Sequence, residues 1–116
     1  MSVEGDQRAI CQRYGVVFDP PSTFEKVGIA LLTLHLEPLN GLRLRAANGT
    51  CGWYIWGGSK MSSASDFFDP LHVHHLDERC PAVLAYLALP PGSRFLIAAD
   101  HEVVWDDPSL LKAGAV

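Results

Sequence analysis

Apolar and polar residues form short patterned stretches in this chain, separated by prolines, glycines and asparagines. Residues 6–14 place apolar side chains such as Ile10 at helical spacing behind Asp6, which can cap a helix, and Gly15 follows as a stop signal. The consecutive Pro20 and Pro21 exclude regular structure next, so this stretch is read as the connection into a sheet. We therefore expect a short amphipathic helix first, followed by strands.

Two alternating segments flank Asn40-Gly41. Residues 27–38 alternate in part, at Leu32, Leu34 and Leu36, and residues 42–46 alternate clearly. Alternation on both sides of Asn-Gly is the strongest short hairpin signal. The sequence therefore predicts that these two segments pair as a hairpin.

The stretch "TCGWYIWGG", residues 50–58, carries apolar groups on both faces of a strand. Cys51, Trp53 and Ile55 point one way, and Tyr54 and Trp56 the other. This pattern predicts a central strand that is covered on both sides. Its aromatics could instead form a stacking platform for bases, but such a platform needs basic neighbours and few follow, so core packing is preferred.

The second half of the chain predicts a loop, two short helices and a hairpin. Residues 57–66 are small and polar, typical of a surface loop. Asp69 can cap a helix that has Pro70 at its first position, and Pro81 ends this helix and starts another. Residues 93–99 and 102–106 flank Asp100 as a closing hairpin. The predicted class is α+β: a mainly antiparallel sheet with an N-terminal helix and two short helices between strands.

Composition predicts one soluble domain over residues 1–116. The chain is 48% hydrophobic and 19% charged, and it contains no run close to the ~20 apolar residues of a membrane span. We expect it to be cytoplasmic. Cys11, Cys51 and Cys80 are odd in number and widely spaced, so reduced, buried thiols are expected and no disulfide.

The net charge of −4 is unevenly distributed. Residues 1–60 hold six Lys and Arg against five Asp and Glu (+1), and residues 61–116 hold three against eight (−5). An acidic surface repels nucleic acid and anionic membranes and attracts cationic partners, although scattered solvation is the plainer role of such carboxylates.

The stretch "FFDPLHVHHLDERCP", residues 67–81, raises the question of a metal site. On the predicted helix, Val73, Leu76 and Cys80 form the buried stripe. His72 and His75 share the face next to this stripe, which makes them a plausible pair of metal ligands, whereas His74 points elsewhere. Arg79 lies four residues after His75, where a fixed cation opposes a divalent metal, and no HExxH pattern is present. No metal and no cofactor are therefore predicted. A small zinc hydrolase using His72 and His75 remains the alternative.

Other catalytic chemistry has weaker support. Cys51 has no nucleophile elbow around it, and "GWYIWGGSK" lacks the spacing of a phosphate-binding loop. The residues by themselves indicate no enzyme.

Several ordered segments resemble a known family. "GWYIW", "FFDPLHVHHL" and "AYLALPPGSRFLI" stand in the order and spacing of the bacterial immunity proteins of family thirty-three from polymorphic toxin systems, over residues 26–107. The resemblance implies a cytoplasmic α+β protein, without enzymatic activity, that binds and neutralises a cognate protein toxin. Nucleic acid and membranes are not expected as partners.

The candidate contacts to such a toxin are acidic residues of the second half, together with two aromatic residues that could anchor the interface. Several stand at predicted loop or element ends, where binding residues collect. They are Asp66, Phe67, Phe68, Asp69, Glu78, Asp100, Glu102, Asp106 and Asp107.

Overall fold

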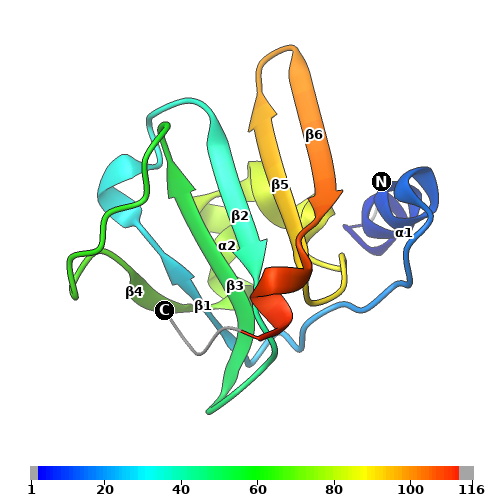
Figure 1. Ribbon diagram of the computed structural model, residues 1–116, viewed down its shortest axis with the longest axis horizontal. Helices are drawn as coiled ribbons and strands as arrows, with labels where there is room; N and C mark the ends of the chain where they lie inside the picture. Colours follow the sequence, from blue (N-terminus) through cyan, green and yellow to red (C-terminus); the bar gives the residue numbers. More distant parts are fainter. Residues whose placement is uncertain (1–2, 113–116) are drawn as a thin grey trace.

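Six short strands form one mixed sheet in the computed structural model, which describes residues 3–112. From edge to edge the strands are β4 (Asp69–His72), β1 (Lys26–Ile29), β3 (Thr50–Gly57), β2 (Leu39–Arg43), β5 (Ser93–Ala98) and β6 (His101–Asp106) (Figure 1). Neighbours pair antiparallel except β1 and β3, which are parallel. The predicted α+β class is confirmed, and β4 and β6 are the two opposite edges.

Helices cover the sheet mainly on one face. The chain forms α1 (Val3–Tyr14), η1 (Leu31–Thr33), η2 (Val73–His75), α2 (Leu76–Arg79), η3 (Pro81–Tyr86) and η4 (Pro108–Leu111), where η marks a 3₁₀ helix. Figure 1 shows α2 behind the sheet, whereas the red η4 lies in front of it. The predicted first helix is confirmed, with an earlier start, and Gly15 follows it with a φ of +66° that ends the helix.

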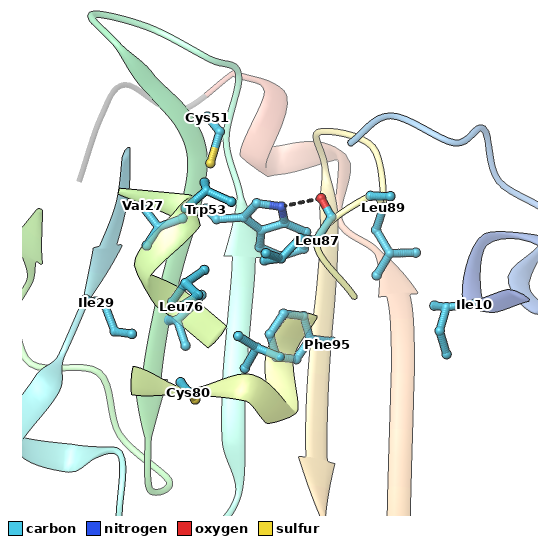
Figure 2. Close-up of a cluster of buried hydrophobic side chains, with 14 of the residues drawn as sticks. Ile10, Val27, Ile29, Cys51, Trp53, Leu76, Cys80, Leu87, Leu89 and Phe95 are labelled. Atoms are coloured by element: carbon cyan, nitrogen blue, oxygen red, sulfur yellow. Dashed lines mark hydrogen bonds between the residues drawn. The ribbon is translucent and has the colours of Figure 1, made fainter. Parts of the chain in front are cut away.

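The main core lies between the sheet and the helical layer (Figure 2). Trp53 and Phe95 from the strands have ring centroids 5.3 Å apart, and Leu76 and Leu87 from the opposite layer are fully buried with them. Val73 and Cys80 are buried too, which confirms the stripe that the sequence predicted on this segment. All three cysteines are buried and free, also as expected.

Strand β3 is central and covered on both faces, as predicted. Cys51, Trp53 and Ile55 belong to the main core, while Tyr54 and Trp56 belong to a second, smaller cluster on the other face. Every residue from Cys51 to Gly57 is buried.

The hairpin predicted around Asn40-Gly41 is wrong. Both residues lie inside β2, and β2 pairs with β3 around the second Asn-Gly, where Asn48 and Gly49 have φ of 54° and 81°. Positive φ at both central residues is what a tight hairpin turn requires. Gly41 serves packing, because a Cβ there would stand 2.2 Å from the Phe95 ring.

The long strand expected over residues 27–38 is also shorter than predicted. It ends at Ile29, and η1 and turns follow. Leu32 is 89% exposed, so the alternating leucines of this stretch do not mark a buried face. The apolar pattern corresponds to a strand only as far as Ile29, where the parallel pairing with β3 ends.

The helix predicted to begin at Asp69 is wrong in its first turn. Residues Asp69–His72 form edge strand β4, paired with β1, and the helical turns begin at Val73. Pro70 fits an edge strand because its missing N–H is not needed on the outer side. The second short helix, η3, and the closing hairpin of β5 and β6 are confirmed.

Candidate partner-binding surface

The sheet face opposite the main helical layer carries the second apolar cluster. Its buried members are Ala30, Leu42, Leu44, Tyr54, Trp56 and Leu110, and Phe67 and Phe68 pack against them. Leu110 comes from η4, and the two phenylalanines come from the segment that leads into β4. Loop segments and one short 3₁₀ helix thus cover this face.

Residues Asp66, Phe67, Phe68 and Asp69 form what we call the acid-aromatic segment. Phe68 packs edge-on against Tyr54, with centroids 5.2 Å apart, and against Phe67 at 4.8 Å. Both phenylalanines are half-buried, whereas both carboxylates are exposed. The aromatic rings thus hold the segment on the sheet and present its two charges to solvent.

Trp56 completes this aromatic cluster from the floor of the sheet. Its ring lies 6.3 Å from that of Phe68, edge to face. The buried indole N–H finds no hydrogen-bond acceptor within residues 3–112. Ring packing therefore fixes this side chain, with no hydrogen bond from its N–H to assist.

An open pocket of about 410 Å³ lies beside the acid-aromatic segment. Loop residues 62–65 line it together with Lys26, Tyr54 and Asp69. Gly28 in β1 allows Tyr54 to lie across the strand, because a Cβ there would stand 2.6 Å from the Tyr54 ring. The predicted surface loop is confirmed as exposed over residues 59–66, and it borders this pocket.

The remaining acidic candidates lie elsewhere. Asp100 and Asp106 are exposed on the hairpin that ends in edge strand β6, across the sheet from the acid-aromatic segment at β4. Glu78 is exposed on α2, in the helical layer. The nine candidate residues therefore occupy three separate regions of the molecule.

Asp107 is engaged within the chain. Its carboxylate accepts a hydrogen bond from Arg94 Nε at 2.7 Å, and it also accepts from the Ser109 backbone N–H at the start of η4. These bonds lower the pKa of Asp107, the largest contribution coming from the Ser109 hydroxyl. The residue caps the last helix, a task that the sequence reading did not assign to it.

The Glu102 side chain, on β6, binds residues of α1 and η3. Its Oε2 accepts from Tyr14 at 2.5 Å and from Arg13 at 2.7 Å, and its Oε1 accepts from Tyr86 at 2.6 Å. Burial alone would raise the pKa of Glu102, but the three hydrogen bonds outweigh it and lower the pKa. Burial, and then the bond to Glu102, raise the pKa of Tyr86. This carboxylate fastens α1 and η3 to β6.

Replacing Glu102 with glutamine is expected to reduce the free energy of unfolding by about 1–2 kcal/mol at neutral pH, because bonds to a charged acceptor become weaker or are lost. A lowered folded-state pKa stabilises the fold above the ordinary glutamate value of 4.5. That contribution is lost as pH falls through the folded-state pKa. Urea unfolding of both proteins from pH 7 to pH 3 measures it.

The matched control is Asp100→Asn, a similar change at an exposed position of the same hairpin. The free energy of unfolding of this variant should equal that of the wild type at every pH. If the gap between wild type and Glu102→Gln stays constant down to pH 3, the three hydrogen bonds do not depend on the ionised carboxylate.

The histidines lie closer together than the predicted helix allowed. His74 and His75 have ring centroids 4.1 Å apart, and His72 stacks on His74 at 5.4 Å. The expectation that His74 points away from its neighbours was wrong, because this segment is a strand end and a 3₁₀ turn. Even so, no group of three or more His, Cys, Asp or Glu side chains in the described part of the chain could hold a metal ion.

The cysteines are unsuited to nucleophilic chemistry. Burial is the main cause that raises the pKa of Cys11, Cys51 and Cys80, which disfavours the reactive thiolate. This agrees with the sequence prediction of buried structural thiols.

Trp105 was not identified from the sequence as a surface residue. It is 41% exposed near the end of edge strand β6. A signal was present, since "VVWDD" places a tryptophan directly before two aspartates. Its exposure could not be read from the sequence, because "VVW" alone is equally typical of a buried strand.

Fold and surface together define a small α+β domain with no metal-binding cluster in the residues described, in which the exposed candidate carboxylates lie in three regions. The family model described as the Imm33-like domain matches residues 6–107, so the chain belongs to the Imm33-like family. The resemblance stated from the sequence is thereby confirmed and extends to α1. No curated protein and no solved structure matches. Between residues 3 and 112, no helix is long and apolar enough to cross a membrane.

Proposed function

We propose that this chain is a cytoplasmic immunity protein that binds a cognate protein toxin and inhibits it stoichiometrically, without turnover or cofactor. The observation that carries the proposal is the match to the Imm33-like domain over residues 6–107. Binding occludes the toxin's active site or locks the toxin in an inactive state. Buried thiols and the lack of a metal-binding side-chain cluster in the described residues agree with a binding role.

The test first looks for a toxin domain encoded next to this gene, and then titrates that domain with the protein. Toxin activity should fall linearly with added protein and vanish at one equivalent. An enzyme that modifies the toxin would instead inactivate it progressively at far less than one equivalent. No inhibition at any ratio would refute the proposal for this pair.

We further propose that exposed carboxylates steer a cationic toxin toward the protein. The net charge is −4, and the second half of the chain carries the negative excess. Asp66, Asp69, Asp100 and Asp106 are exposed, and in the residues described none has a hydrogen bond or ion pair through its side chain. Such free surface charges act on the association rate more than on the final affinity. Glu78 is exposed as well and belongs to the same proposed set.

Reversing Asp66 and Asp69 to lysine is expected to slow association with the toxin by about tenfold at low salt. The effect should shrink at high salt, because exposed charges are screened over ~10 Å at 0.1 M ionic strength. Stopped-flow association across a salt series measures it, with the fold checked by circular dichroism. Asp100 and Asp106 form the second pair, since reversing Asp107 would also break its bonds to Arg94 and Ser109.

The control reverses Glu4 and Asp6 in the first turn of α1, which gives the same change in net charge on another element. Because this reversal also removes the ion pair of Glu4 with Arg8, the fold of the control is checked by circular dichroism as well. If this pair slows association as much as the others, only the total charge matters. If no pair changes the rate at low salt, acidic steering is excluded and apolar contacts must account for binding.

A further inference from the structure

Strand β6 is an open edge of the sheet. It spans six residues, "HEVVWD", and among residues 3–112 it pairs only with β5. An edge strand leaves alternate N–H and C=O groups free to pair with another strand. The opposite edge, β4, is poorly suited to this role, because it has four residues and includes Pro70, which has no N–H.

A small pocket lies beside the outer half of β6. It has a volume of about 200 Å³, and its walls are Tyr14, Val16, Val104, Trp105 and Asp106, with Pro90 and Ser93 closing it on the β5 side. Most of this lining is apolar, and Asp106 contributes a carboxylate. Asp106 is exposed and makes no side-chain hydrogen bond or ion pair with the part of the chain that the structure describes. Such a pocket suits the aliphatic stem of a lysine or arginine whose cation reaches the carboxylate.

A strand from another molecule could pair with the free edge of β6. The negative charge of this edge disfavours β6 of a second copy of the chain in that position. An antiparallel copy of β6 centred on Val104 would place Glu102, which already pairs with Arg13, opposite the Asp106 of the other copy, so that Asp106 would face a carboxylate and no free cation. Like charges directly opposite each other destabilise a strand pair. A segment that carries lysine or arginine meets Asp100 and Asp106 with the opposite sign, so a cationic partner is favoured.

We propose that β6 accepts an extended, cationic segment of the toxin as an added strand, with one of its lysine or arginine side chains in the pocket beside Trp105 and Asp106. Backbone hydrogen bonds supply affinity in this mode, and the pocket supplies specificity. The identity of the partner as a toxin rests on the proposed function. The ability of β6 to accept a cationic strand does not depend on it.

The probe is a short capped peptide of alternating valine and lysine, titrated to millimolar concentration against the ¹⁵N-labelled protein. Amide shifts are expected along β6 and at Trp105. A peptide with an N-methyl group on every residue has no N–H to donate along either edge, and a peptide with glutamate for lysine lacks the cation. Both should bind about tenfold more weakly. Absence of shifts in β6, or equal binding of the N-methylated peptide, would overturn the proposal.

Variants of the protein test the pocket itself. Trp105→Ala and Asp106→Asn should each weaken binding of the valine-lysine peptide by about tenfold. The matched controls are Phe24→Ala, which removes an aromatic side chain that is 79% exposed, and Asp77→Asn on α2. Both controls should leave binding unchanged. Equal losses in the controls would show nonspecific binding and exclude the β6 pocket.

The two proposals fail separately. If the peptide binds β6 but the protein does not inhibit the toxin domain tested, the proposed function fails and the strand-accepting edge stands. If the toxin is inhibited and neither Trp105→Ala nor Asp106→Asn changes its affinity, the toxin binds elsewhere and only the present inference is refuted.

Discussion

Replacing Trp53 with alanine is expected to lower the free energy of unfolding by roughly 3–5 kcal/mol, the cost typical of removing a large aromatic side chain from a core. Trp53 is fully buried in the central strand β3. Its ring packs against Phe95, and its indole N–H donates to the Leu87 carbonyl at 2.8 Å (Figure 2). The substitution therefore leaves a cavity between the sheet and the helical layer, and the Leu87 carbonyl keeps only its longer hydrogen bond, from Arg43 Nη1 at 3.3 Å.

Urea unfolding and the melting temperature report this loss. The matched control is Trp105→Ala, which removes the same side chain from a position that is 41% exposed. Surface substitutions of this kind change stability by about 0.5 kcal/mol. If Trp53→Ala were as stable as Trp105→Ala, the packing of the helical layer on β3 would contribute nothing to stability.

Replacing Arg43 with methionine is expected to cost about 3 kcal/mol, because hydrogen bonds from a charged group are lost and buried carbonyls are left without donors. Arg43 is 4% exposed. Its Nε donates to the Cys51 carbonyl at 3.0 Å, and its Nη1 donates to the carbonyls of Asp19 and Leu89, each at 2.7 Å. The side chain thereby joins β2 and β3 to the first loop and to the turn after η3.

Burial is the main cause that lowers the pKa of Arg43, and no carboxylate makes an ion pair with it in the described structure. Carbonyl oxygens compensate the buried charge, together with the Trp53 ring, whose centroid lies 5.8 Å from the guanidinium carbon. Arg43→Lys should therefore also be destabilised, because a single ammonium group cannot reproduce the planar fork.

The control for this prediction is Arg45→Met, two residues further along the chain. Arg45 is exposed and donates one hydrogen bond, to the Leu111 carbonyl at 3.1 Å. Equilibrium unfolding in urea should separate the two variants clearly. Equal stabilities would mean that water satisfies the carbonyls around position 43 once the guanidinium is gone.

Local pattern was sufficient for several parts of the fold. The two-sided apolar pattern of residues 51–56 predicted a covered central strand, and both faces of β3 are indeed buried. Gly15 predicted the end of the first helix, and residues 93–106 predicted the closing hairpin. In each case neighbouring residues carry the signal, so the chain need not be folded for it to be read.

The candidate surface was predicted less completely. The exposure of Asp66, Asp69, Asp100 and Asp106 was expected from charge, but Glu102 and Asp107 form bonds within the chain. Tyr14 and Tyr86 bind Glu102 from 88 and 16 residues away along the chain. No local pattern encodes such pairs, because only the packing of α1 and η3 beside β6 brings the partners together.

The sequence by itself determined the α+β class, the central strand, the apolar stripe of Val73, Leu76 and Cys80, and the family resemblance. The tertiary structure alone decided which of two Asn-Gly pairs makes the hairpin turn. Gly41 lies in β2 because the Phe95 ring occupies the space of its missing side chain. The tertiary structure also decided that β4 and β6 are opposite edges and that Trp105 is exposed. Strand order depends on contacts between residues that are far apart in the chain. A periodic pattern shows which side chains are apolar, but it does not show which strand or helix packs against them.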